Sequence, residues 1–202
     1  MSENNVVVPV VPIIEFMGLI DNNSALSLMN AVNQHIYNTQ NLSKIQIHIS
    51  SPGGDIISSI ALYNYLRSLP VPTRIVNIST VASGAVIVYL AADERFAVKN
   101  CNFMLHNLLF PQEFKNLEYH QISHLITNID DDTKNYVDIY KERTVSAKKQ
   151  LDIIEVMKGP LIRISPDQAV EYGMANKVIP VEDIRKIDSV KKTTKNKKPK
   201  TE

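Results

Sequence analysis

The chain is poor in the residue types that build several common kinds of site. Its 202 residues include no tryptophan and one cysteine, and only 6% of them are aromatic. So few rings leave little material for a surface that stacks on sugars or nucleic-acid bases. The lone Cys101 excludes an intramolecular disulfide framework and fits a reducing cytoplasm. We therefore expect a cytoplasmic protein whose own core stabilises the fold.

Long hydrophobic runs are also missing. No apolar stretch reaches the roughly 18 to 20 residues that are needed to span a bilayer. Residues 1–16 lack a basic segment and carry Pro9 and Pro12 inside their apolar part, so we expect no signal peptide. These absences predict a protein with no membrane partner.

The formal net charge of +1 conceals an uneven distribution, because lysines crowd the end of the chain and leave the rest acidic. An acidic body is not expected to bind nucleic acid. The lysine-rich end has too few apolar residues to order itself. We therefore expect one domain over residues 1–188 and a disordered basic tail over residues 189–202.

Apolar stretches with the spacing of strands alternate with stretches that have the spacing of helices. Alternation of this kind predicts right-handed strand–helix–strand crossovers and a largely parallel sheet, hence an α/β fold. Ser165 to Gln168 form a capping box that opens a helix ending near Gly173. We expect strands over 6–16, 45–49, 74–78, 95–98 and 103–105, and helices over 21–39, 56–68, 82–90, 115–143, 146–157 and 165–173.

Two turns between an apolar strand and a helix carry the candidate chemistry. In the first, Gly53 and Gly54 place bare backbone N–H groups at a helix start, where a developing oxyanion is stabilised. A purely structural turn is the alternative interpretation of this motif. The chain has neither a dinucleotide fingerprint nor a phosphate-binding loop at this turn, and no cofactor is expected.

The second turn places Ser83 before Gly84, between small residues at the start of an apolar helix. At such a junction a serine hydroxyl is exposed and the next N–H points the same way. A simple helix N-cap is the alternative role for this serine. His106 ends a further short strand. Together these residues supply a nucleophile, a base and an oxyanion hole.

Four segments in order carry a family resemblance. They are residues 47–54 (Ile-His-Ile-Ser-Ser-Pro-Gly-Gly), 82–85 (Ala-Ser-Gly-Ala), 104–107 (Met-Leu-His-Asn) and 165–173. They resemble motifs of the proteolytic subunit of the ATP-dependent Clp protease, the ClpP family, which shares its fold with the crotonases. The resemblance extends over about residues 14–180. It implies a ClpP/crotonase-like spiral of β-α-β units with a long handle helix.

The resemblance also implies roles for particular residues. Ser83 becomes the nucleophile, His106 the general base, and the N–H groups of Gly54 and Gly84 the oxyanion hole of a serine endopeptidase. Peptides or unfolded proteins are the implied substrates, and a homo-oligomeric ring with an ATPase unfoldase partner is the implied assembly. A crotonase-type enzyme acting on acyl-CoA is a more remote alternative, because crotonases need no serine nucleophile at this turn.

The third member of the triad is not found. Counting back from the segment that ends at Gly173, the acid of the family falls at Leu161, whose side chain cannot orient an imidazole. The nearest carboxylates in sequence are Asp152, Glu155 and Asp167, and the acid stays unassigned. A catalytically impaired subunit with a structural or partner role is therefore an alternative function.

Two other segments depart from the family. Residues 108–114 replace its glycine-rich strand with a largely apolar sequence, and the chain before Ile14 does not match its N-terminal loops. These differences bear on ring assembly and on docking of an unfoldase.

Other candidates are weaker. Lys99 suggests a Ser–Lys dyad but is also a typical surface lysine, and residues 130–132 (Asp-Asp-Asp) fit the exposed side of a helix. Glu118, His120 and His124 have helical spacing, but without a third ligand of the usual kind no metal site is expected.

Overall fold

The computed structural model describes residues 8–108 and 118–187. In this part of the chain a 7-stranded sheet has the order β1-β2-β3-β4-β7, with all of these neighbours parallel. β5 pairs with β3 in parallel and with β6 in antiparallel orientation. The strands are β1 (Ile13–Met17), β2 (Ile45–Ser51), β3 (Thr73–Ala82), β4 (Glu94–Val98), β5 (Asn102–Leu105), β6 (Ile162–Ile164) and β7 (Lys177–Ile179).

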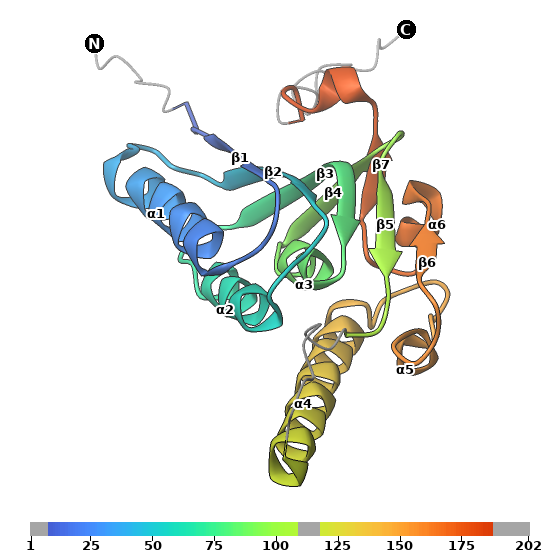
Figure 1. Ribbon diagram of the computed structural model, residues 1–202. Coiled ribbons are helices and arrows are strands. Elements are labelled where there is room, and N and C mark those ends of the chain that lie inside the picture. Colours follow the sequence, from blue (N-terminus) through green and yellow to red (C-terminus); the bar gives the residue numbers. More distant parts are fainter. Residues whose placement is uncertain (1–7, 109–117, 188–202) are drawn as a thin grey trace, which may run out of the picture.

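Helices connect the parallel strands, which confirms the predicted α/β class. α1, α2 and α3 lie on one side of the sheet, the 3₁₀ helix η1 lies on the other, and α4 projects away from the sheet (Figure 1). None of the described helices has the length and apolar character needed to cross a membrane. The helices are α1 (Asn22–Asn38), α2 (Ile56–Arg67), α3 (Gly84–Leu90), α4 (Tyr119–Arg143), α5 (Ile153–Val156), α6 (Pro166–Glu171) and η1 (Val181–Asp183).

Side-chain caps fix where several helices begin. The Asp21 carboxylate accepts from the Ser24 N–H at 2.7 Å and opens α1. The predicted capping box at Ser165 opens α6, and Gly173 follows this helix with a φ of 69°. Each cap satisfies an N–H group that has no partner within its helix.

The sheet is covered on its second face as well. Ile45, Ile47 and Ile49 of β2 are fully buried on one face, and the alternating Gln46 and His48 are only 3% and 4% exposed on the other. The segment that follows β7 covers the polar face, because the Gln46 side-chain amide donates to the Ile184 carbonyl at 3.1 Å. β2 is therefore a central strand with helices on one side and the end of the domain on the other.

Buried charges on this second face are paired. Arg74, 2% exposed, donates to Glu94 at 2.6 Å and to the Gln46 side chain at 2.9 Å. Burial alone would raise the pKa of Glu94, but hydrogen bonds from Lys44 and Arg74 hold this pKa below its ordinary value. These hydrogen bonds link the starts of β2, β3 and β4 without leaving an isolated buried ion.

The prediction of one helix is mostly wrong, because the helix expected over residues 146–157 is limited to Ile153–Val156. The Lys149 N–H donates instead to the Glu171 carbonyl at 3.0 Å, which ties this segment to the end of α6. A tertiary hydrogen bond has replaced the helical one, since isolated short helices are marginal on their own.

The first strand is shorter than predicted, and other expectations are untested. Within the described part of 6–16, β1 begins only at Ile13, because Pro9 and Pro12 have no N–H group to donate to a neighbouring strand. The 3-residue strands β6 and β7 were not predicted. The expectations for 109–114, for the start of the helix at 115 and for the tail over 189–202 lie outside the described residues.

Candidate active site

Ser83 occupies a strained turn between β3 and α3. Its φ of 52° and ψ of −129° are unusual for a residue other than glycine. The Ser83 N–H donates to the Met104 carbonyl at 2.9 Å, and its own carbonyl accepts from Val86 at 2.9 Å. The hydroxyl makes no cap bond to α3. Ser83 therefore stands at the N-cap position of α3, as the alternative interpretation expects, but its side chain does not cap the helix. Among the described residues its hydroxyl makes no hydrogen bond.

The helix behind Ser83 is held rigidly at its far end. All residues of α3 are buried. Arg143 donates to the carbonyls of Leu90 and Ala92 at 2.8 and 3.0 Å, and Arg95 donates to Leu90 at 3.3 Å. Burial, together with the charge of Arg143, lowers the pKa of Arg95 to about 10. Cations at this end of a helix complement its dipole, so these arginines stabilise the element that positions Ser83.

The turn at Gly53 and Gly54 packs directly against the Ser83 turn. Their φ values of 92° and 150° suit glycine. A methyl group on Gly53 would lie 2.7 Å from Ser83 Cβ, and one on Gly54 would lie 2.1 Å from the Ile20 carbonyl oxygen. A methyl group on Gly84 would lie 2.4 Å from Ser59 Oγ. The chain is therefore packed so closely at these three positions that any side chain larger than the hydrogen of glycine would collide with its neighbours.

Two N–H groups are left open by this packing. In the described part of the chain no hydrogen-bond acceptor faces the Gly54 N–H, while its neighbour Asp55 donates to Ile20 at 2.8 Å. The Gly84 N–H is at the first position of α3, where no intrahelical acceptor exists. Gly54 lines the same cavity as Ser83, whereas Gly84 is buried and is not among the residues that line it.

His106 follows the end of β5 and is half-buried. Its Nδ1 lies 2.6 Å from the carbonyl oxygen of Asn107. Because a carbonyl can only accept, this contact requires the proton on Nδ1 and leaves Nε2 unprotonated in the neutral ring. The arrangement prepares Nε2 to accept a proton.

Ser83, His106 and Gly54 face one cavity of 570 Å³. Its remaining wall is largely apolar and comes from α4, from the start of α2 and from the loop after β1. The other lining residues are Leu19, Pro52, Asp55, Ile56, Ile57, Leu108, Leu125, Asn128, Ile129 and Asp132.

Asp132 corrects a prediction about the acidic run at 130–132. Asp130 and Asp131 are exposed as expected, but Asp132 is half-buried in the cavity wall. Burial raises the pKa of the Asp132 carboxyl, and the charges of Asp55 and Asp131 add to the effect. The sequence contains a signal for this position, because Leu125, Ile129 and Asp132 share one face of a helix.

Leu161 lies where a partner of His106 would be placed. β5 and β6 pair Met104 with Arg163 and Leu105 with Ile162. One further step along the same register sets Leu161 opposite His106. Leu161 is 50% exposed, so an acidic side chain would fit there without burial.

The three carboxylates nearest to Leu161 in sequence either bind other groups or are exposed away from the cavity. Asp152 caps α5 by accepting from the Glu155 N–H at 3.2 Å. Glu155 forms an exposed ion pair with Lys158 at 3.3 Å. Asp167 is an exposed residue in the first turn of α6. None of the three lines the cavity that contains His106.

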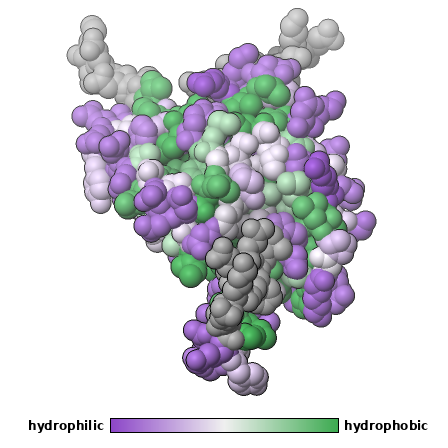
Figure 2. Space-filling view, viewed as in Figure 1, coloured by the Kyte–Doolittle hydropathy of each residue, from purple (hydrophilic) through white to green (hydrophobic). Residues whose placement is uncertain are grey.

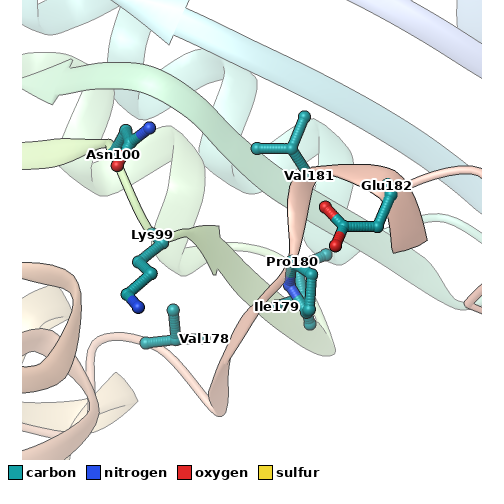
Figure 3. Close-up of a pocket in the computed structure, with 7 residues that line it drawn as sticks. All are labelled: Lys99, Asn100, Val178, Ile179, Pro180, Val181 and Glu182. Atoms are coloured by element: carbon teal, nitrogen blue, oxygen red, sulfur yellow. The ribbon is translucent and has the colours of Figure 1, made fainter.

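Lys99 does not form a dyad with Ser83. It precedes the amino end of β5, whereas Ser83 lies beside the carboxyl end of the same strand. Lys99 instead lines a separate cavity of 520 Å³ with Asn100 and with residues 178–182 (Figure 3). The Ser–Lys hypothesis is therefore wrong.

The other sequence candidates are also placed. His120 contacts Glu118 at 3.2 Å on an exposed face of α4. Among residues 8–108 and 118–187, no group of three potential ligands is arranged to hold a metal ion. Cys101 is buried, and burial raises the pKa of its thiol to about 12, which disfavours the reactive thiolate.

Comparisons with known proteins identify relatives of this chain. The ATP-dependent Clp protease proteolytic subunit 2 of Treponema pallidum is 34% identical over 67 residues, which are 32% of this chain and 34% of that protein. The subunit 2 of Pseudomonas aeruginosa is 26% identical over 159 residues, 72% of this chain and 70% of that protein. The match thus covers about a third of the length of the Treponema pallidum subunit and 70% of the length of the Pseudomonas aeruginosa subunit.

A solved structure and a family model extend the match. A mutant ClpP1 from Listeria monocytogenes aligns with a TM-score of 0.68 at 21% identity, over 85% of this chain and 93% of that one. This likeness shows a ClpP-like fold, as the sequence predicted. The family model described as Clp protease matches residues 12–182. The match covers most of the chain, and the chain therefore belongs to the Clp protease family.

Proposed function

We propose that this protein is a serine endopeptidase that cleaves peptides or unfolded proteins in the cytoplasm. The observation that carries the proposal is the cavity that Ser83, His106 and Gly54 line together, with a Ser83 hydroxyl that makes no hydrogen bond among the described residues. A serine on a strained strand–helix turn, next to free N–H groups, is suited to acyl transfer. Membership of the Clp protease family supports the same chemistry.

The steps follow from the atoms that these residues present. Ser83 Oγ attacks the peptide carbonyl carbon while His106 Nε2 takes the hydroxyl proton. The oxygen of the carbonyl becomes negative and accepts from the N–H groups of Gly54 and Gly84. As the C–N bond breaks, His106 returns the proton to the leaving amine. Water then attacks the acyl-enzyme and loses a proton to His106. His106 gives this proton to Ser83 Oγ as the bond between Oγ and the acyl carbon breaks and the acid leaves.

The Asn107 carbonyl takes over part of the work of a triad acid. It accepts from Nδ1 at 2.6 Å and so fixes the tautomer that leaves Nε2 free. A neutral carbonyl stabilises the protonated imidazole less than a carboxylate does. In other serine proteases, replacing the acid costs roughly 10⁴-fold in rate. We therefore expect slow peptide hydrolysis and easier hydrolysis of activated esters.

The nucleophile is tested with a fluorophosphonate probe. We expect covalent labelling of the wild type at Ser83, found by peptide mass mapping. Ser83→Ala removes the nucleophile and should abolish labelling, while its circular dichroism matches the wild type. Ser123→Ala changes an exposed serine on α4 outside the cavity and should label normally.

Labelling that persists in Ser83→Ala, or a wild type that never reacts, would contradict the peptidase proposal. The second result would favour a catalytically impaired subunit with a structural or partner role. Leu161, at the position where the family resemblance implies the acid, is the observation that favours this alternative.

The variant Leu161→Asp tests whether the triad has lost its acid or whether another residue supplies the acid. Extending the register of β5 and β6 by one residue would set this position opposite His106, so we expect the new carboxylate to stabilise the imidazolium and raise peptide turnover about tenfold or more. Leu161→Asn is the matched control and should give no such gain. Efficient cleavage by the wild type, with no response to Leu161→Asp, would show that another residue supplies the acid.

We also propose that the protein assembles as a homo-oligomeric ring, and that an ATPase unfoldase is its partner. Exposed apolar side chains on the projecting half of α4 support assembly, namely Tyr119, Ile122 and Ile126 at 88%, 44% and 48% exposure. Figure 2 shows both hydrophobic and hydrophilic residues at the protruding tip of the molecule. We also expect the largely apolar segment over residues 108–114 to be buried in or near a contact of the ring, and most of this segment lies outside the described residues.

Sedimentation velocity tests the assembly. We expect a closed oligomer at micromolar concentration, and its dissociation in Ile122→Asp, because a charge in an apolar contact is costly to desolvate. Lys134→Asp is a control for added negative charge on the same helix, at an exposed position nearer the sheet. A wild type that sediments as a stable monomer contradicts the proposal.

A further inference from the structure

We propose that the cavity beside Ser83 selects substrates with lysine or arginine as the residue that supplies the scissile carbonyl. The aliphatic stem of that side chain would lie on the apolar wall, and its cation would reach the carboxylates of Asp55 and Asp132. This inference rests on the proposed peptidase function of the same site and names its substrate class.

The apolar wall is composed of residues that a long aliphatic side chain can lie against. Leu125 and Ile129 are one helical turn apart on α4, and Asp132 follows on the same face. Ile56 at the start of α2 and Leu108 after β5 also line the cavity. Lysine and arginine bury their methylene groups along such a surface while the charged end stays at a polar group. A wall that leads from leucine and isoleucine to aspartate therefore matches a basic side chain better than a wholly apolar one.

Both carboxylates retain the capacity to bind a cation. Asp55 uses one oxygen to cap α2, accepting from the Ser58 N–H at 2.7 Å. Asp132 makes no hydrogen bond or ion pair with any described residue. Among the described residues that line the cavity there is no lysine or arginine, and His106 is the only basic side chain. Within this part of the chain a substrate cation would thus meet two acceptors and neither a lysine nor an arginine.

The electrostatics of the cavity support the same conclusion. Burial, with the neighbouring charges of Asp55 and Asp131, disfavours ionised Asp132. A cation that enters the cavity relieves this repulsion and replaces the water lost by the carboxylate. A glutamate side chain would increase the repulsion, and a leucine side chain would leave the carboxylates desolvated without a partner.

The test compares three phosphonate probes that carry the same leaving group. Their side chains are those of lysine, of norleucine (the same stem without the ammonium group) and of glutamate. The second-order rate constant for modification of Ser83 is measured by intact mass. For the wild type we expect lysine to exceed norleucine by about tenfold, the size of one half-buried ion pair, and glutamate to react slowest.

Two isosteric variants identify the groups responsible. Asp132→Asn should reduce the lysine-to-norleucine ratio to near one. Asp55→Asn should reduce it in part while keeping the cap of α2, because asparagine caps helices as well as aspartate does. Asp130→Asn, on the exposed side of the same helix, should leave the ratio unchanged.

Equal rates for lysine and norleucine in the wild type would overturn the selectivity while leaving the peptidase proposal intact. A preference that survives in both Asp132→Asn and Asp55→Asn would overturn the assignment of these carboxylates. If neither these probes nor the simple fluorophosphonate modifies Ser83, the peptidase function itself fails, and the selectivity fails with it.

Discussion

The contact between two strand–helix turns is the constraint on which the candidate active site depends. The turn at Gly53 and Gly54 approaches Ser83 so closely that a methyl group on Gly53 would lie 2.7 Å from Ser83 Cβ. This approach is possible only with glycine, because both backbone positions have positive φ and no space for Cβ. The same contact sets the backbone of the Gly53–Gly54 turn against Ser83. The remaining elements hold the two turns in this position.

The parallel sheet explains why distant segments meet here. β2 and β3 are neighbours, and both carry their turns at the carboxyl edge of the sheet. β5 pairs with the end of β3 and brings His106 to the same edge. α4 then supplies an apolar wall and Asp132. Ser83, His106 and the cavity wall therefore come from separate strand–helix units that one sheet brings together.

The sequence predicted the parts of the molecule that local patterns determine. Alternating strands and helices indicated the α/β class, and the serine between small residues pointed to Ser83. Residues that matter only through tertiary contacts were missed. Asp132 looked like a member of an exposed acidic run until α4 was placed against the cavity. The helix expected over 146–157 failed because Lys149 binds the end of α6, a partner that its own segment does not reveal.

The central claim is that Ser83 and the two glycine N–H groups form one acyl-transfer site. A crystal structure of the phosphonylated protein tests it most directly, because the phosphonyl oxygen occupies the position of the oxyanion. We predict a covalent bond from phosphorus to Ser83 Oγ, with the phosphonyl oxygen within about 3 Å of the N atoms of both Gly54 and Gly84. An adduct at another residue, or a phosphonyl oxygen turned away from both N–H groups, would contradict the account.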